Sequence, residues 1–190
     1  MPEPAASHRS RSPEYALLGL LYLQSDHGYN LHRRLIAELG GSWHIRQSQS
    51  YTILKRLKRE GYLTATPVKQ AKLPALQSLK LTPAGRQRFT TWLKTPTGSS
   101  VRAIRMEFIT RVYFMEKIRP AQVQPMFAEQ ILAVQATLSR LESSLSALPE
   151  AQTYSRLSLQ LRIRQLDSTI AWLEESRLEF PVRPEGSAAR

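Results

Sequence analysis

Cysteine is absent from this sequence: none of its 190 residues is Cys. A chain without cysteine can form no disulfide and no thiolate zinc site, and it cannot use a cysteine nucleophile. The absence is typical of proteins in a reducing compartment, and we expect a cytoplasmic location.

Long apolar segments are also missing. The longest apolar run, Ala16 to Leu23, is far shorter than the roughly 20 residues that a membrane-spanning helix requires. Residues 1–11 contain no apolar stretch of the kind that a signal peptide needs, and we expect them to form a flexible basic arm. The sequence therefore gives no reason to expect a membrane protein.

The side chains that most catalytic and metal sites use are sparse. The four histidines stand at positions 8, 27, 32 and 44, and no carboxylate cluster lies beside them in the sequence. No phosphate-binding loop, dinucleotide fingerprint or Gly-x-Ser-x-Gly elbow occurs. We therefore expect neither an enzyme nor a protein that depends on a metal or another cofactor.

Acidic residues are few, and most of the imbalance lies in the first half of the chain. The sequence holds 27 Lys and Arg against 15 Asp and Glu, a net charge of +12. Residues 1–95 carry 15 basic and 5 acidic residues, whereas residues 96–190 carry 12 and 10. This asymmetry indicates a module that binds a polyanion, joined to a module with another role. A basic protein without a polyanion partner is the alternative that charge leaves open.

Proline and glycine divide the first half into short elements. Helices are predicted over residues 12–24, 29–39, 48–60 and 82–94. A turn is predicted over 25–28, and Ser48 and Thr82 are the expected caps of their helices. Two strands are predicted over 62–66 and 77–81, joined by a hairpin tip over 67–76. The side chains expected to face the core of this half include Leu31, Leu35, Ile36, Leu39, Tyr15, Tyr29, Tyr51 and Trp92. A lining for an effector cavity is the alternative interpretation of the four aromatic residues.

Three helices followed by a hairpin and a fourth helix make up a winged helix-turn-helix domain, which suits binding to DNA. The helix over 48–60 is short, polar and cationic on one side, and a major groove admits one such helix. The DNA-contacting residues predicted for this helix are Gln47, Ser48, Gln49, Ser50, Thr52, Lys55, Arg56 and Arg59. The hairpin is predicted to add Lys69, Lys72 and Lys80. An ordinary solvated helix face is the alternative interpretation of the same charges.

The second half is predicted to be helical. Residues 95–100, TPTGSS, form the expected linker, and the helix over 101–117 carries Ile104, Phe108, Val112 and Met115 on one stripe before Arg119-Pro120 breaks it. Two long helices with heptad spacing follow, joined by a turn at 148–151. The first seam consists of Phe127, Ile131, Val134, Leu138, Leu141, Leu145 and Leu148. The second consists of Leu159, Ile163, Leu166, Ile170 and Leu173.

An antiparallel hairpin with such seams leaves apolar surface exposed, which a second copy could bury. We therefore expect a homodimer formed through the seam residues from Ile131 to Leu145 and from Ile163 to Leu173; a monomer whose hairpin folds back on the first half is the alternative. The predicted fold class is mainly α with a small β-wing. A DNA-binding domain over 12–94 would precede an antiparallel helical dimerisation domain over 101–180, and residues 181–190 would form a flexible tail.

Four segments of the first half resemble the PadR family of bacterial transcriptional regulators. They are residues 12–21 (SPEYALLGLL), 27–31 (HGYNL), 43–63, with the spacing Tyr-x-x-Leu-x-x-Leu-x-x-x-Gly, and 81–86 (LTPAGR), followed by Trp92-Leu93. The second half, with Arg105–Phe108 and Tyr113-Phe114, is similar to the longer subfamily, whose helical C-terminal domain is related to virulence-gene activators. The resemblance implies a homodimeric repressor on an inverted-repeat operator, with release by a small-molecule effector in some members.

The hairpin departs from the family pattern. Where the family commonly has a basic pair and a tyrosine before the last strand, this chain has Leu76, Gln77 and Leu79, and Pro74 stands where a wing proline is expected. The departure motivates an alternative function, that of a protein-interaction scaffold that has lost specific DNA binding.

Overall fold

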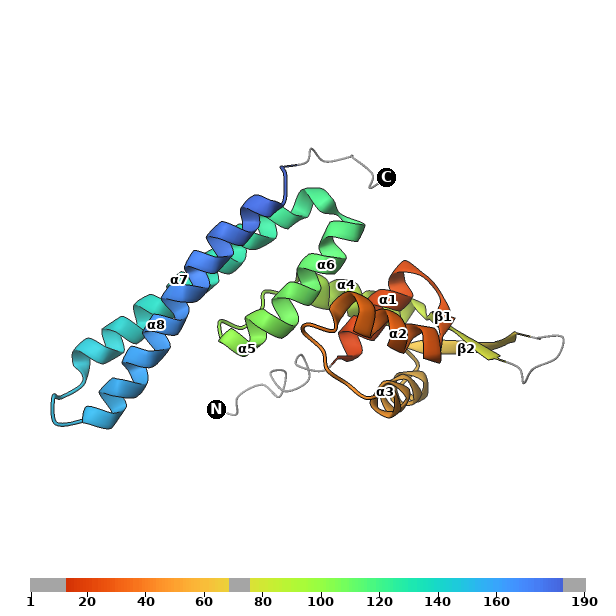
Figure 1. The fold of residues 1–190 in the computed structure, drawn as a ribbon, viewed down its shortest axis with the longest axis horizontal. Coiled ribbons are helices and arrows are strands. Elements are labelled where there is room, and N and C mark those ends of the chain that lie inside the picture. The colour runs from red at the N-terminus through yellow and green to blue at the C-terminus, as the bar shows by residue number, and fades with distance from the viewer. Residues whose placement is uncertain (1–12, 69–75, 183–190) are drawn as a thin grey trace. The chain divides into compact units, whose positions relative to one another are not determined.

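The computed structural model describes residues 13–68 and 76–182, and the chain divides into two compact units between Thr95 and Pro96 (Figure 1). The first unit contains four helices and a three-stranded antiparallel sheet, and the second is helical. The predicted fold class, mainly α with a small β-wing, is confirmed. No helix in the described residues is long and apolar enough to cross a membrane.

The elements of the first unit follow the predicted order. They are α1 (Glu14–Leu23), β1 (Asp26–His27), α2 (Gly28–Leu39), α3 (Gln47–Arg59), β2 (Leu63–Val68), β3 (Leu76–Leu81) and α4 (Pro83–Lys94). Helix α1 is the centre of this unit, because its residues from Ala16 to Leu21 are all buried. The ring of Tyr15 in α1 stacks on Trp92 of α4, with 4.7 Å between the ring centroids.

The structure corrects two predictions in this unit. Asp26 and His27 are not only a turn: they form strand β1, which pairs with Leu79 and Ser78 of β3, so the sheet order is β1-β3-β2. A strand of two residues has no alternation from which it could be predicted. Ile36 is 41% exposed, since α2 buries only the narrower stripe of Leu31, Leu35 and Leu39.

Gly61 ends α3 as predicted. Its φ of +80° is the only positive φ among the described residues, and glycine adopts this conformation without a steric penalty. The amide of Gly61 donates to the Lys58 carbonyl and the amide of Tyr62 to the Leu57 carbonyl, which is a Schellman motif. The Thr82 hydroxyl, which caps α4 as predicted by accepting from the Gly85 amide, also donates to the Gly61 carbonyl at 2.8 Å. The end of α3 and the start of α4 are thus joined.

Gly85 provides a test of this junction. A Cβ at position 85 would lie 2.2 Å from the carbonyl oxygen of Tyr62, which is backbone and cannot move aside as a side chain could. We expect Gly85→Ala to lower the free energy of unfolding by about 3 kcal/mol, measured by urea denaturation. Gly41→Ala is the control, because a Cβ there meets nothing within 4 Å, and its effect should stay within about 0.5 kcal/mol. Equal effects at both positions would contradict the close packing of α4 on Tyr62.

The second unit is built from one interrupted helix and a helical hairpin. Its elements are α5 (Val101–Ala103), the π-helical turn η1 (Ile104–Phe108), α6 (Ile109–Ile118), the 3₁₀ turn η2 (Pro120–Gln122), α7 (Val123–Ala147), α8 (Thr153–Ser176) and the 3₁₀ turn η3 (Arg177–Glu179). The predicted stripe of Ile104, Phe108, Val112 and Met115 is buried, and the helix ends before Arg119-Pro120 as expected. The π-helical turn was not predicted.

Helices α7 and α8 pack against each other as the predicted antiparallel hairpin. All buried residues of α7 lie at or before Val134, and all buried residues of α8 lie at or after Leu166. We call residues 123–134 and 166–176 the closed half of the hairpin, and residues 135–165 the open half. The seam residues that are only half-buried are Leu138, Leu141, Leu145, Leu148, Leu159, Ile163 and Ile170. Apart from Ile170, the seam is therefore buried in the closed half, and it is only half-buried in the open half.

The segment predicted as a linker contains one firmly held residue. Thr97 is buried, and its backbone amide and carbonyl each form a 3.1 Å hydrogen bond with the side-chain amide of Gln130 in α7. Its hydroxyl accepts a 2.6 Å hydrogen bond from Arg111, which also faces Glu107 at 3.8 Å. The composition of residues 95–100 could not show this, because the partners of Thr97 lie 14 and 33 residues further along the chain.

Candidate nucleic-acid interface

One face of α3 is exposed, polar and cationic. Ser48, Tyr51, Thr52, Lys55 and Arg59 recur at the helical spacing of three and four residues, and all five are exposed. Tyr51 was predicted to lie in the core, yet 45% of it is exposed, and Tyr29 of α2 is likewise 51% exposed. We call the five exposed residues of α3, which are Ser48, Tyr51, Thr52, Lys55 and Arg59, the α3 face. A surface of this composition can donate and accept hydrogen bonds and can attract anions.

The opposite side of α3 faces the core of the unit. Leu54 and Leu57 are buried there, and Ser50 is completely buried. The Ser50 hydroxyl lies 2.9 Å from Nδ1 of His32 in α2, a hydrogen bond that satisfies a polar group away from water. The structure thus corrects the expectation for Ser50, which was predicted to contact DNA and instead points inward.

The start of α3 is capped differently from the prediction. The N-terminal cap residue is Arg46, and its backbone amide donates a 2.8 Å hydrogen bond to Oε1 of Gln49. Ser48, the expected cap, is instead the second residue of the helix, and its carbonyl accepts a hydrogen bond from the Thr52 hydroxyl. The carbonyl end of the exposed Gln49 side chain is therefore committed to the helix start.

A buried carboxylate connects α3 to its neighbours. Glu14 of α1 is only 2% exposed, and its two oxygens pair with Arg56 of α3 and Arg88 of α4. Glu60 lies 4.0 Å from Arg56 and 3.8 Å from Arg88. We call these four residues the Glu14 network. Arg56, which was predicted to contact DNA, is directed toward Glu14 in this network, and the Glu14 carboxylate neutralises much of the charge of Arg56.

Arg88 is held in its charged form. Burial alone would lower the pKa of Arg88, but the Glu14 carboxylate and a hydrogen bond to Tyr62 outweigh it, so the pKa of Arg88 is raised above its ordinary value. Its guanidinium also lies over the Tyr62 ring, 4.4 Å from the centroid. The Glu14 network therefore contains two permanent cations around one buried anion.

The wing offers little charge in its described part. Lys80 of β3 is exposed opposite Thr64 of β2, and it is the only cation in the two strands as the structure describes them. Leu79, at one of the positions where the sequence departs from the family pattern, is buried. Lys69 and Lys72 lie outside the described residues. The predicted DNA-contacting residues that the structure places together and exposed are thus Gln47, Ser48, Gln49, Thr52, Lys55 and Arg59.

Tyr51 is the residue of this surface that sequence reasoning missed. A Cβ on Gly28 would lie 2.8 Å from the Tyr51 ring, so the ring lies directly against the bare backbone at the start of α2. The pairing of a glycine with an aromatic residue 23 positions later gives no periodic signal. Only the phase of α3, set by buried Ser50, Leu54 and Leu57, turns Tyr51 outward.

Comparison with known proteins covers both units. Residues 17–91 match the model of the transcriptional regulator PadR-like family, and residues 104–179 match that of the virulence activator alpha C-terminal domain. The negative transcriptional regulator PadR of Bacillus subtilis (strain 168) is 30% identical over 172 residues, which cover 85% of this chain and 93% of that protein.

Two solved structures of Bacillus subtilis PadR are similar to the chain, each 27% identical. The complex with operator DNA has a TM-score of 0.43 and covers 88% of this chain and 98% of that one. The complex with p-coumaric acid has a TM-score of 0.40, with coverage of 95% and 98%. The matches to the two family models and the 30% identity to the Bacillus subtilis regulator confirm the resemblance that the sequence motifs indicated.

Proposed function

Since this chain belongs to the PadR-like family of transcriptional regulators, we propose that it is a repressor that binds a specific, inverted-repeat operator as a homodimer. The observation that carries the proposal is the α3 face, an exposed polar and cationic helix surface on a packed three-helix scaffold. Its Bacillus subtilis relative is by name a negative regulator, which supports repression. The family is one of regulators and not of enzymes, and we infer a cytoplasmic location.

In this proposal α3 enters the major groove of DNA, which is about 12 Å wide. Gln47, Ser48, Gln49 and Thr52 lie near the N-terminus of the helix, where side chains usually reach base edges. Lys55 and Arg59 lie further along the exposed side, where they can contact phosphates. Tyr51 adds an aromatic ring and a hydroxyl at the edge of the same face. Ser50 and Arg56 are not among the proposed DNA contacts, because Ser50 bonds to His32 and Arg56 pairs with Glu14.

Dimerisation follows from the symmetry of an inverted repeat, since two half-sites about one helical turn apart need two recognition helices. The partly solvated seam in the open half of the hairpin provides apolar surface for a second copy. Light scattering at micromolar concentration is expected to give a mass near twice 21.7 kDa. A mass near the monomer value would contradict the homodimer. Release from DNA by a small molecule, which the resemblance implies for some members, belongs to the same proposal.

Selection of bound sequences from random duplex DNA at physiological salt tests the proposal. We expect an enriched inverted repeat and an affinity that falls steeply with salt, because each phosphate neutralised contributes about −0.9 to the slope of log K against log salt. The weakly charged wing is the observation that favours the alternative, a protein-interaction scaffold. Binding of all sequences with equal affinity would reject the specific repressor in favour of that alternative.

A further inference from the structure

The chain leaves the first unit at Thr95, which is still bound to the end of α4. The amide of Thr95 donates a 3.1 Å hydrogen bond to the Trp92 carbonyl, and its hydroxyl donates one of 2.8 Å to the Thr91 carbonyl. Its ψ of 132° is extended, as the proline that follows favours. The first unit therefore holds the chain up to the last residue before the boundary.

The second unit binds the chain at Thr97, two residues later. Thr97 is 4% exposed, and its amide, carbonyl and hydroxyl are all hydrogen-bonded, to Gln130 of α7 and Arg111 of α6. Ser99 adds a further attachment, since its hydroxyl lies 3.1 Å from the hydroxyl of Thr137 in α7. The segment that starts at Thr97 is thus fixed to the second unit.

Only Pro96 lies between the two attached residues. Its ring fixes its φ, and one extended residue spans at most about 3.6 Å. We call residues 95–97 the joint. The composition of this region is that of a flexible linker, yet the joint has no slack, because both of its ends are hydrogen-bonded and one exposed proline connects them.

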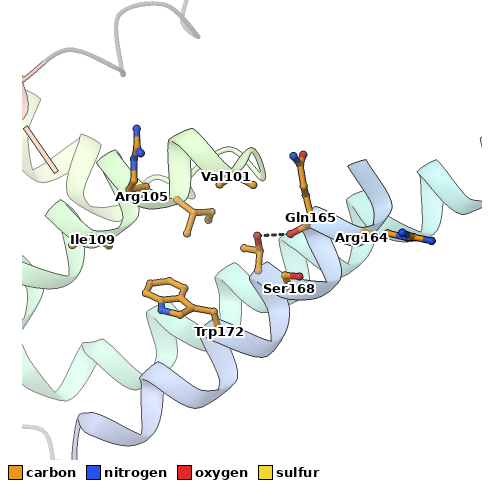
Figure 2. Close-up of a pocket in the computed structure, with 9 residues that line it drawn as sticks. Val101, Arg105, Ile109, Arg164, Gln165, Ser168 and Trp172 are labelled. Carbon is orange, nitrogen blue, oxygen red and sulfur yellow. Dashed lines mark hydrogen bonds between the residues drawn. The ribbon is translucent and has the colours of Figure 1, made fainter. Parts of the chain in front are cut away.

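The helix that follows the joint packs incompletely on α8. A groove of about 580 Å³ lies between the two, and Val101 and Ile104 are among the residues that line it. Figure 2 shows the Trp172 ring of α8 directed into this space. Packing on this side therefore does little to fix the joint, and its position depends on the contacts of Thr97 with Gln130 and Arg111.

The cluster that holds Thr97 is polar and buried. The Gln130 side chain is 2% exposed; it accepts from the Thr97 amide and donates to the Thr97 carbonyl, so an apolar residue would leave both groups unsatisfied. Glu107, in the π-helical turn η1, lies 3.8 Å from Arg111 and provides its counter-charge. Turns of this kind are frequent at functional positions. A buried polar cluster adds little stability compared with apolar packing, but when its groups are satisfied it fixes one arrangement.

The separation of two operator half-sites changes in steps of one base pair. Each added base pair moves one half-site by about 3.4 Å and turns it by about 34° around the DNA axis. Recognition helices on slack linkers can follow such a change, because a few flexible residues reach further than one base pair. A joint of one residue has no such reach, so the two recognition helices of a dimer can engage only a narrow range of separations.

We propose that this joint determines the half-site separation that the repressor accepts, with Gln130 and Arg111 as positioning residues that hold Thr97 and do not touch DNA. Loss of the attachment then broadens the spacing preference without changing how each α3 face binds its half-site. The proposal rests on the homodimer and the inverted-repeat operator of the proposed function, and it identifies the part of the chain on which operator spacing depends.

Lengthening the joint tests the proposal in the full-length protein. Insertion of Gly-Ser-Gly between Thr95 and Pro96 adds about 10 Å of reach and leaves both attachments in place. The DNA is the selected operator, with its half-sites moved apart or together by one base pair. The parent protein is expected to lose affinity about tenfold or more, because the second half-site no longer adds to binding, whereas the insertion variant should lose about threefold or less. The same insertion between Glu150 and Ala151, in the loop between α7 and α8, is the control and should keep the parental profile.

Removal of the Gln130 amide tests the attachment itself. Gln130→Met keeps the length of the side chain and loses both hydrogen bonds to Thr97. It is expected to flatten the spacing profile as the insertion does, and to bind a duplex with a single half-site within about twofold of the parent. Gln135→Met, at an exposed glutamine of the same helix, is the matched control. Thr97→Ser should keep the parental profile, since it retains the hydroxyl that binds Arg111.

Hydrogen exchange reports the attachment without DNA. The Thr97 amide is buried and hydrogen-bonded, so in the parent it should exchange slowly, measured by mass spectrometry of a peptide covering residues 95–100. Gln130→Met should speed this exchange at least about tenfold and leave peptides from α8 unchanged. If Gln130 only stabilised the unit, exchange would accelerate throughout residues 96–182 instead.

A parent protein that tolerates several half-site separations, or an insertion variant that keeps a sharp parental profile, would overturn the role of the joint and leave the specific repressor intact. A Gln130→Met variant that loses affinity equally at every separation and on the single half-site would overturn the positioning role of Gln130. A parent protein that binds all sequences equally would overturn the repressor, and the spacing proposal with it.

Discussion

Replacing Glu14 with alanine is expected to lower the free energy of unfolding by about 3 to 5 kcal/mol, a large fraction of the stability of an ordinary domain. The carboxylate is 2% exposed and is the shared counter-charge of Arg56 and Arg88, whose side chains are 40% and 18% exposed. Without it, Arg88 stays charged in a largely buried position, and Glu60, at 3.8 Å and half in solvent, replaces only part of the interaction. Removal of one member of a buried ion pair is costly for this reason.

Urea denaturation measures the effect, and Glu38→Ala provides a matched control. Glu38 also pairs with an arginine, Arg34, at 3.4 Å, but both side chains are partly exposed and one turn apart on α2. Its replacement should cost only about 0.5 kcal/mol. Glu14→Gln, which keeps the shape and one hydrogen-bond acceptor, should fall between the two. Similar losses for Glu14→Ala and Glu38→Ala would show that the Glu14 network does not hold α3 in place.

The double variant Lys55→Ala/Arg59→Ala is expected to weaken DNA binding about 100-fold, by a similar factor on operator and unrelated DNA. Both residues are exposed on the α3 face, beyond the positions that approach base edges. Loss of two phosphate contacts at about 1.4 kcal/mol each accounts for the factor, and it should reduce the magnitude of the salt slope by about 2. Fluorescence anisotropy over a series of salt concentrations measures both quantities.

Lys117→Ala/Arg119→Ala is the control for net charge. Both residues are exposed at the end of α6, so this variant loses two positive charges as well, but from the second unit instead of from α3. We expect its affinity to change less than about threefold. If both double variants weaken binding equally, the contribution of Lys55 and Arg59 is one of overall charge, and α3 is not the contacting helix.

Local sequence signals predicted most element boundaries in this protein. Pro83, Gly61 and Pro120 stand where a helix starts or stops, and each acts through its own backbone. The heptad spacing likewise predicted the α7–α8 hairpin. These signals need no knowledge of distant residues, which is why they can be found in a single sequence.

The orientation of side chains on α3 depended on distant partners and was only partly predicted. Ser50 points inward because its hydroxyl hydrogen-bonds to His32, which lies 18 residues earlier in the chain. Arg56 is oriented by its ion pair with Glu14, which lies 42 residues earlier. Polar residues such as these carry no periodic signal of burial, since their burial is compensated by a specific partner. An exposed polar surface on this helix could therefore be predicted from the sequence. Which residues belong to that surface could be determined only from the structure.

The cap at the start of α3 constrains how operator preference can diverge among related regulators. Because Gln49 accepts the Arg46 amide hydrogen, a substitution there changes both the surface offered to DNA and the helix start, at a cost of about 1 kcal/mol. Neither Ser48 nor Thr52 hydrogen-bonds to the cap residue Arg46; the Thr52 hydroxyl donates to the Ser48 carbonyl instead. Divergence toward new operators is thus expected to accumulate at Ser48 and Thr52 first, with Gln49 changing only alongside a compensating residue.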